Sequence, residues 1–357
     1  MDVSGSGGAC RALLARRVSF IALILAVVSL AAPPLGAADR AAEIRAVWVS
    51  SAAVESPEAF RRAVSTARAD GFDTVLVPIG LADAAPGPAF DRLSARIGEA
   101  RDAGLRVHAW VQATVVAPPG ELPAARDHVI YRHPEWLMVP RELATELLEL
   151  DLRAPDYIGR LARWTRANAG RTDGLYLSPL HADVAAYAAE ALTEIVTRFD
   201  VDGVHFDAMR FPGLDFDYGR QAMDVFRRDL RPRLSEDERA YLDYVETIDP
   251  FAYAEEFPAE WRRFRVTRLT ALVTRLRTAV KSVRPDAIVS ATVTAGAERA
   301  MDDELQDWRT WLDNGFVDAL ARRGTASTTL LFSYDALIAP SADSASAPQP
   351  SPAAGSH

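Results

Sequence analysis

Cysteine and histidine are both scarce in this chain of 357 residues. The only cysteine, Cys10, lies ahead of an apolar run that we expect to be removed, so the mature chain has no disulfide, thiol catalyst or cysteine-bound zinc. The six histidines are scattered, whereas a metal site needs several convergent ligands. The sequence also lacks a Gly-x-Ser-x-Gly elbow and a phosphate-binding loop, which argues against an esterase of that type and against a nucleotide-binding enzyme.

Residues 1–38 have the pattern of a secretory signal peptide. Arg11, Arg16 and Arg17 precede the apolar run 18–30, and small residues at 36–38 form a cleavage site. The run is shorter than the roughly 20 residues that a spanning helix needs, and an uncleaved anchor is the alternative. We therefore expect an exported protein, periplasmic or secreted, without a stable membrane span after cleavage. Its formal net charge of −9 disfavours binding to nucleic acid.

From residue 43, short β-rich runs alternate with helical patterns, which is typical of βα units. No Gly-x-Gly-x-x-Gly follows the first strand, so a doubly wound dinucleotide-binding sheet is disfavoured. The repetition favours an α/β fold of the TIM (β/α) barrel type over residues 43–335, and the short finish leaves open that the barrel is incomplete at its C-terminal end. Residues 339–357, rich in Ala, Ser and Pro, are predicted to be a disordered tail. The predicted strands are 44–50, 74–78, 106–111, 203 onward, 287–293, 316–320 and one near 328; the predicted helices are 56–70, 91–103, 182–199, 260–283 and 303–314, with long excursions at 114–179 and 213–257.

The stretch 202–212, Asp-Gly-Val-His-Phe-Asp-Ala-Met-Arg-Phe-Pro, is predicted to carry chemical groups to the end of a buried strand. Apolar positions 204 and 206 alternate with His205 and Asp207, and Pro212 stops the strand. Side chains at such strand ends meet at the carboxyl edge of a parallel sheet. Arg210 is expected to hold Asp207 ionised or to bind a substrate carboxylate or hydroxyl. A salt bridge that only closes the strand end is the alternative.

Several segments occur in an order that is far more specific than any one of them. They are Arg-Ala-Val-Trp-Val at 45–49, Gly-Phe-Asp-Thr-Val-Leu-Val at 71–77, Gly-Leu-Arg-Val-His-Ala-Trp-Val at 104–111, His-Pro-Glu-Trp-Leu at 133–137, the stretch 202–212, Gln-Asp-Trp at 306–308 and Trp-Leu at 311–312. Together they resemble the bacterial glycosyl hydrolase-like family ten. The resemblance implies a TIM-barrel hydrolase of glycosidic bonds that acts outside the cytoplasm on cell-wall or other bacterial polysaccharide.

Glycoside hydrolysis commonly uses two carboxyl groups about 5 to 9.5 Å apart. Asp207 is the predicted central carboxylate, as nucleophile or general acid. Glu298, in the loop after the 287–293 strand, is the predicted partner, although an ordinary surface acid explains it equally well. The other options for the second carboxyl group are Asp183, Asp215 and Asp307.

Aromatic and polar side chains at the predicted strand ends suit the binding of sugar rings. His108 and Trp110 share one face of the 106–111 strand, and Trp48 lies on the first strand, where core packing is an equal alternative. The predicted substrate-binding residues are Arg210, His205, His108, Trp110, Tyr176, Trp48 and Asp307.

The favoured function is a glycosidase with a polysaccharide substrate and with no metal or other cofactor. Two alternatives stay open. A non-catalytic glycan-binding protein is one, because the end of the second strand, Val-Pro-Ile-Gly at 77–80, departs from the family pattern. A metal-dependent hydrolase or deacetylase is the other, because His205 and Asp207 could converge with His108 and His181.

Overall fold

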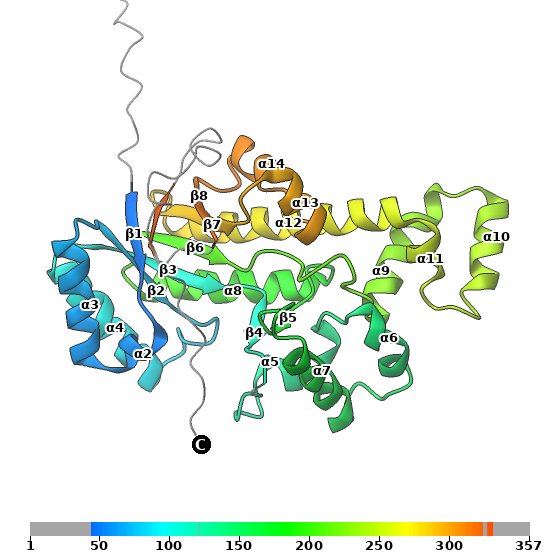
Figure 1. Ribbon diagram of the computed structural model, residues 1–357, viewed down its shortest axis with the longest axis horizontal. Coiled ribbons are helices and arrows are strands. Elements are labelled where there is room, and N and C mark those ends of the chain that lie inside the picture. Colours follow the sequence, from blue (N-terminus) through cyan, green and yellow to red (C-terminus); the bar gives the residue numbers. More distant parts are fainter. Residues whose placement is uncertain (1–43, 121, 324–326, 331–357) are drawn as a thin grey trace, which may run out of the picture. The chain divides into compact units, whose positions relative to one another are not determined.

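The computed structural model describes residues 44–120, 122–323 and 327–330. These residues form a mixed α/β fold in which a curled, mostly parallel sheet makes a half-barrel (Figure 1). The strand order is β8-β7-β6-β3-β2-β1-β9, and only β9 runs antiparallel to its neighbour. The strands are β1 (Ile44–Trp48), β2 (Thr74–Pro78), β3 (Arg106–Gln112), β6 (Gly203–Asp207), β7 (Ile288–Val293), β8 (Ala319–Arg322) and β9 (Ser327–Leu330).

Helices follow most of the parallel strands, and the two long excursions hold further elements. A two-stranded antiparallel sheet, β4 (Val115–Ala117) and β5 (Leu175–Tyr176), lies in the first excursion. The helices are α2 (Ser51–Glu55), α3 (Pro57–Ala69), α4 (Pro88–Asp102), α5 (Val129–Arg132), α6 (Arg141–Leu148), α7 (Pro155–Ala167), α8 (Ala182–Arg198), α9 (Arg220–Leu230), α10 (Glu236–Val245), α11 (Ala252–Glu256), α12 (Pro258–Val283), α13 (Ala297–Glu304) and α14 (Trp308–Asp313), with 3-10 turns at Pro134–Trp136 and Arg231–Arg233.

Local signals explain where these helices begin and which face they bury. In α3, the Ser56 side chain accepts a hydrogen bond from the Ala59 amide, and Pro57 occupies the first turn, where its missing N–H costs nothing. Helix α12 buries apolar side chains at three- and four-residue intervals, from Trp261 to Val280. That stripe packs against α8, so the two helices lie side by side on the sheet (Figure 1).

The sheet separates two sets of buried side chains because successive residues of a strand point to opposite faces. The outer set, which includes Val75, Val107 and Phe206, belongs to the large core shared with the helices. The inner set is smaller and contains Leu76 and Ala319 with the half-buried rings of the tryptophans on β1 and β3. The concave face of the half-barrel is therefore a separate, partly polar compartment.

The structure confirms the barrel-type α/β fold and corrects two element boundaries. The predicted helix 303–314 is two helices, because Leu305 has a left-handed backbone with φ of 57° that ends α13. The predicted strand 316–320 begins later, at Ala319. The predicted signal peptide, 1–38, and the predicted tail, 339–357, lie outside the described residues.

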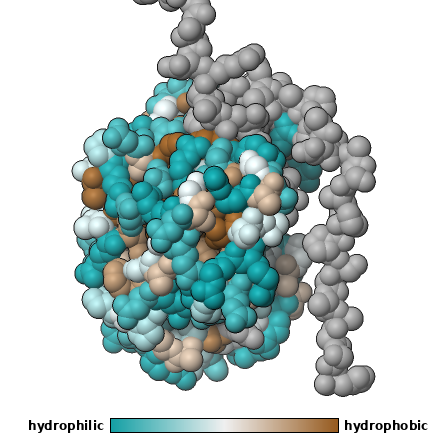
Figure 2. Space-filling model, turned by 90° about the vertical axis from the view of Figure 1, so that its left-hand side faces the viewer, coloured by the Kyte–Doolittle hydropathy of each residue, from teal (hydrophilic) through white to brown (hydrophobic). Residues whose placement is uncertain are grey.

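No helix of the described ranges combines the length and apolar character needed to cross a membrane. The face that carries α2, α3 and α4 is predominantly hydrophilic (Figure 2).

Candidate active site at the mouth of the half-barrel

Asp207 is the last residue of β6 and lies at the carboxyl edge of the sheet, as the sequence predicts. Its neighbour in the ladder is Gln112, the last residue of β3, whose Nε2 donates to Asp207 Oδ2 at 3.3 Å. Ala208 then turns the chain with φ of 54°, a left-handed conformation that costs energy for a residue with a Cβ. The Thr114 hydroxyl donates to the Ala208 carbonyl at 2.9 Å and stabilises this turn. The turn ends the strand directly after the carboxylate.

The strand register places the other predicted residues deeper in the half-barrel. Trp110 pairs with His205 one layer below Asp207, and His108 pairs with Gly203 one layer below that. Both histidines are fully buried, and burial lowers the pKa of each to about 3. This corrects the expectation that they contact substrate, because a period of two residues carries them away from the mouth.

Within the half-barrel, two hydroxyl groups and a tryptophan ring contact the His205 side chain. Its Nδ1 lies 2.8 Å from Ser290 Oγ and its Nε2 lies 2.8 Å from Thr292 Oγ1. The Trp48 ring packs edge-on against the imidazole, with 5.9 Å between the ring centroids. Trp48 is therefore a half-buried packing residue of the concave face, which is the alternative that the sequence left open.

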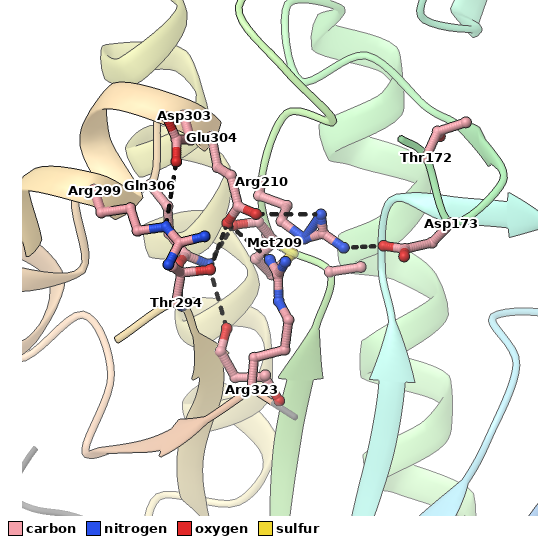
Figure 3. Close-up of polar contacts among 12 residues, drawn as sticks. Thr172, Asp173, Met209, Arg210, Thr294, Arg299, Asp303, Glu304, Gln306 and Arg323 are labelled. Carbon is pink, nitrogen blue, oxygen red and sulfur yellow. Dashed lines mark hydrogen bonds and ion pairs between the residues drawn. The ribbon is translucent and has the colours of Figure 1, made fainter. Parts of the chain in front are cut away.

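Arg210 joins the end of β6 to two carboxylates (Figure 3). Its NH2 group bonds Asp173, and its NH1 group lies 3.7 Å from Glu304 Oε1. Glu304 in turn accepts from the Thr294 hydroxyl at 2.8 Å and from Arg323 at 2.7 Å. Burial, followed by the nearby Arg323, lowers the pKa of Arg210 to about 10, so the guanidinium stays charged at neutral pH. Arg210 therefore pairs with Asp173 and Glu304 and not with Asp207, which was one of the two roles expected for it; the other, binding a substrate carboxylate or hydroxyl, stays a prediction.

Tyr176 connects this network to Asp207. Its hydroxyl donates to Asp173 Oδ2 at 2.7 Å. Its pKa is raised, first by burial and then through the negative charges of Asp207 and Glu304, against the opposing charge of Arg323. The ring is only 2% exposed, so the expectation of an open wall for sugar stacking is wrong. Tyr176 is instead a buried residue whose hydroxyl binds Asp173.

None of the four predicted second carboxylates forms a hydrogen bond or ion pair with Asp207 among the described residues. Glu298 is exposed in the first turn of α13, and no hydrogen bond or ion pair among the described residues joins it to Asp207. Asp307 caps α14 by accepting from the Thr310 amide at 3.3 Å, which is a structural role. Asp183 is exposed in the first turn of α8, and Asp215 pairs with Arg171 at 2.6 Å.

Gln306 hydrogen-bonds to backbone groups near the ends of β6 and β7. The Gln-Asp-Trp motif at 306–308 does not predict this role. Its Nε2 donates to the carbonyls of Met209 and Thr292 at 3.2 Å each, and its Oε1 accepts from the Thr294 amide at 3.0 Å. The side chain is 1% exposed. It therefore ties the segment after β6 to the end of β7.

Arg265 on α12 binds the loop that connects β6 to α9. It donates to the carbonyls of Leu214 and Phe216, and its guanidinium lies 4.6 Å from the centre of the Trp261 ring. The neighbouring Asp217 accepts from the Val139 amide at 3.1 Å, and burial raises its pKa to about 6. These contacts hold the loop between β6 and α9 against α12 and the segment before α6.

A cleft of about 880 Å³ lies across the carboxyl ends of β2 and β3, and Asp207 is not among the residues that line it. Trp110 and Gln112 line this cleft, so it reaches the residue that hydrogen-bonds Asp207. Trp136 and Tyr187 form an aromatic wall, with ring centroids 5.9 Å apart. The predicted contact residue Trp110 is thus on the cleft, and its half-buried ring presents an apolar surface of the kind that sugars contact.

The metal-site alternative finds no support in the arrangement of the side chains. Among residues 44–120, 122–323 and 327–330, no three His, Cys, Asp or Glu side chains are placed to hold one ion. His181, named as a third ligand, is buried with its pKa lowered to about 4 by burial. The two ring nitrogens of His205 lie against hydroxyl groups.

Comparison with known sequences places the chain in a family. The sequence model of the family described as glycosyl hydrolase-like 10 matches residues 82–325, which is more than half of the chain. The chain belongs to the glycosyl hydrolase-like 10 family. A relative from Escherichia coli K12, named glycosyl hydrolase DigH, is 25% identical to this family member over 252 residues, which are 66% of this chain and 46% of the relative. The chain thus spans about half the length of the curated relatives it matches.

Solved structures of glycoside hydrolases share the fold of this glycosyl hydrolase-like 10 protein. The catalytic domain of a β-amylase from Paenibacillus polymyxa has a TM-score of 0.51 at 12% identity and covers 80% of this chain and 79% of that one. A β-galactosidase from the psychrophilic Marinomonas ef1 has a TM-score of 0.51 at 9% identity and covers 78% and 40%. At such identities the likeness shows a TIM-barrel-related fold alone.

Proposed function

We propose that the chain is a glycosidase that hydrolyses an extracytoplasmic polysaccharide, with bacterial cell-wall glycan as the substrate class. The observation that carries the proposal is Asp207 at the end of a parallel strand, hydrogen-bonded to Gln112, which also lines a cleft of about 880 Å³. Membership of a glycosyl hydrolase-like family supports it, and so does the name of the relative DigH. The predicted signal peptide supports export to the periplasm or medium.

In this proposal Asp207 works with Asp173. Asp173 has a side chain that is 49% exposed, so it is open to solvent and substrate, whereas the Glu304 side chain is only 12% exposed and already bonded to Thr294 and Arg323. The Tyr176 hydroxyl and Arg210 both contact Asp173 and stabilise its ionised form. Asp173 therefore suits the role of ionised base or nucleophile, and Asp207 is the second carboxyl group of the proposed pair. Glu304 is the positioning residue for Arg210.

The experiment is an incubation of the purified chain with peptidoglycan glycan strands and with neutral polysaccharides, with and without a chelator, followed by measurement of new reducing ends. The proposal predicts new reducing ends that are unaffected by the chelator. Loss of activity with the chelator, and its return with zinc, would instead establish a metal-dependent hydrolase. Activity on neither class of substrate would contradict the proposed hydrolysis.

A glycan-binding protein without activity is the second candidate. One observation favours it: within the described ranges, no carboxylate hydrogen-bonds to Asp207, so the two acids are not paired as they stand. Retained binding to the same glycans, without new reducing ends at any enzyme concentration, would support this second function and reject the first.

A further inference from the structure

Gln112 is the residue through which the cleft contacts Asp207. It is the last residue of β3, and the ladder pairs it with Asp207, the last residue of β6. Its side chain lines the cleft of about 880 Å³, and its Nε2 donates to Asp207 Oδ2 at 3.3 Å. Neighbouring strands lie roughly 4.8 Å apart, so Asp207 lies one strand beyond the cleft lining. A chain held in the cleft therefore passes Gln112 before it reaches the carboxylate.

The Gln112 amide has hydrogen-bonding capacity that the fold does not use. An amide side chain offers two N–H donors and a carbonyl oxygen with two lone pairs. Within the ranges that the structure describes, the bond to Asp207 is the one hydrogen bond of this side chain. Gln112 is only half-buried, and its Oε1 has no partner in those ranges although solvent reaches it. The remaining capacity is therefore open to a ligand in the cleft.

The orientation of the Asp207 carboxylate depends on this amide. Among the described residues, Gln112 is the one hydrogen-bond partner of the Asp207 side chain. Arg210, three residues further along the chain, pairs with Asp173 and Glu304 instead. A carboxylate that acts on a glycosidic bond has to be held in one orientation toward that bond, and small errors of position lower the rate strongly. Gln112 is therefore the side chain that is placed to orient Asp207.

We propose that Gln112 is a positioning residue that couples glycan binding to the chemistry: one amide N–H orients Asp207, and the other amide groups hydrogen-bond a sugar hydroxyl of the chain in the cleft. A hydroxyl both donates and accepts, so it matches the unused N–H and the carbonyl oxygen of one amide. Trp110, two residues earlier on the same face of β3, also lines the cleft and offers the sugar rings an apolar surface. This role rests on the proposed function, because it takes the cleft as the glycan site and Asp207 as a member of the carboxyl pair.

Two substitutions of similar size separate the two contacts of Gln112. Gln112→Glu replaces Nε2 by an oxygen that does not donate when ionised, so it loses the bond to Asp207 and keeps an acceptor for the sugar. Gln112→Met removes the donors and the acceptor without adding a charge. With peptidoglycan glycan strands as substrate, we expect kcat for the release of reducing ends to fall about tenfold to a hundredfold in both variants. We expect KM to rise about fivefold in Gln112→Met alone, because only that variant loses the hydrogen bond to the sugar.

Gln221 provides the matched control. It is half-buried like Gln112, lies on α9 and does not line the cleft. Gln221→Glu and Gln221→Met repeat the same two exchanges of side chain, and we expect both to keep the wild-type kcat and KM. Thermal unfolding of all four variants verifies that each is folded before its kinetics are compared.

The outcomes distinguish the role of Gln112 from the proposed function. An unchanged kcat in either Gln112 variant, an unchanged KM in Gln112→Met, or equal losses in the Gln221 variants overturns the role and leaves the glycosidase proposal standing. Binding of the strands by the wild type without new reducing ends contradicts the proposed hydrolysis instead. Calorimetry then decides the sugar contact: an affinity about fivefold weaker in Gln112→Met supports it, and an unchanged affinity overturns it. Absence of any binding contradicts both proposals.

Discussion

Replacing His108 by leucine will reduce the fall in unfolding free energy that occurs when the pH is lowered from 7 to 5. His108 is fully buried, and neither ring nitrogen has a hydrogen-bond partner within the described residues. Burial, reinforced by the nearby His205, lowers its pKa from 6.5 to about 3. Between these two values the unfolded chain binds a proton that the folded chain does not, so stability falls as the pH falls. The full stability is present above pH 6.5 and is lost progressively toward pH 3.

The size of this loss in unfolding free energy depends on how far the pH falls below the pKa of His108 in the unfolded chain. Lowering the pH from 7 to 5 crosses about 1.5 pH units below the unfolded pKa, which corresponds to about 2 kcal/mol for one histidine. His205 adds a similar loss, because burial also lowers its pKa to about 3. Asp217 acts in the opposite sense, because burial raises its pKa to about 6 and the folded chain takes up its proton first. Both contributions are common to wild type and variant, and they cancel in the difference.

Urea denaturation at pH 7 and at pH 5 measures this difference directly. We expect the fall in unfolding free energy between the two pH values to be about 2 kcal/mol smaller in His108→Leu than in the wild type. At pH 7 the variant keeps wild-type stability or exceeds it, since no hydrogen bond is lost. An identical pH dependence in the two proteins would refute the buried, neutral state of His108.

Two further predictions concern the backbone around Asp207. Gly203→Ala will destabilise the fold by about 1 to 3 kcal/mol, because a Cβ would lie 2.6 Å from the Ile288 carbonyl oxygen and 2.7 Å from His108 Nε2. Thermal unfolding measures this loss, with Gly98→Ala as the control because nothing lies within 4 Å of a Cβ there. Equal effects of the two substitutions would contradict the close packing at Gly203. Ala208→Gly will raise stability by up to about 1 kcal/mol, since φ of 54° suits glycine better; a loss of stability in the same assay would contradict the assigned turn.

The alternation of β-rich and helical segments was sufficient to predict the parallel sheet and the position of Asp207 at the end of a strand. The β2 boundaries match the prediction, and Asp207 closes β6 because a left-handed residue follows it. The depth of each side chain depends on strand register, which a single sequence does not contain. His205 and His108 therefore looked like mouth residues, although the ladder sets them one and two layers below Asp207.

The contacts of the candidate site were less predictable than its central acid. Asp173 and Glu304 come from a loop before β5 and from the end of α13, and only the folded chain brings them to Arg210. Neither acid carries a local sequence signal that separates it from Glu298 or Asp307.

The most direct test of the central claim is the release of reducing ends from glycan strands by Asp207→Asn, measured together with glycan affinity. The exposed Asp286, just before β7 at the opposite edge of the sheet, gives the control Asp286→Asn. Our account predicts that Asp207→Asn loses hydrolysis by about a hundredfold or more while its affinity and folded spectrum stay those of the wild type, and that the control stays active. Full activity in Asp207→Asn would contradict the claim that this carboxylate carries the chemistry.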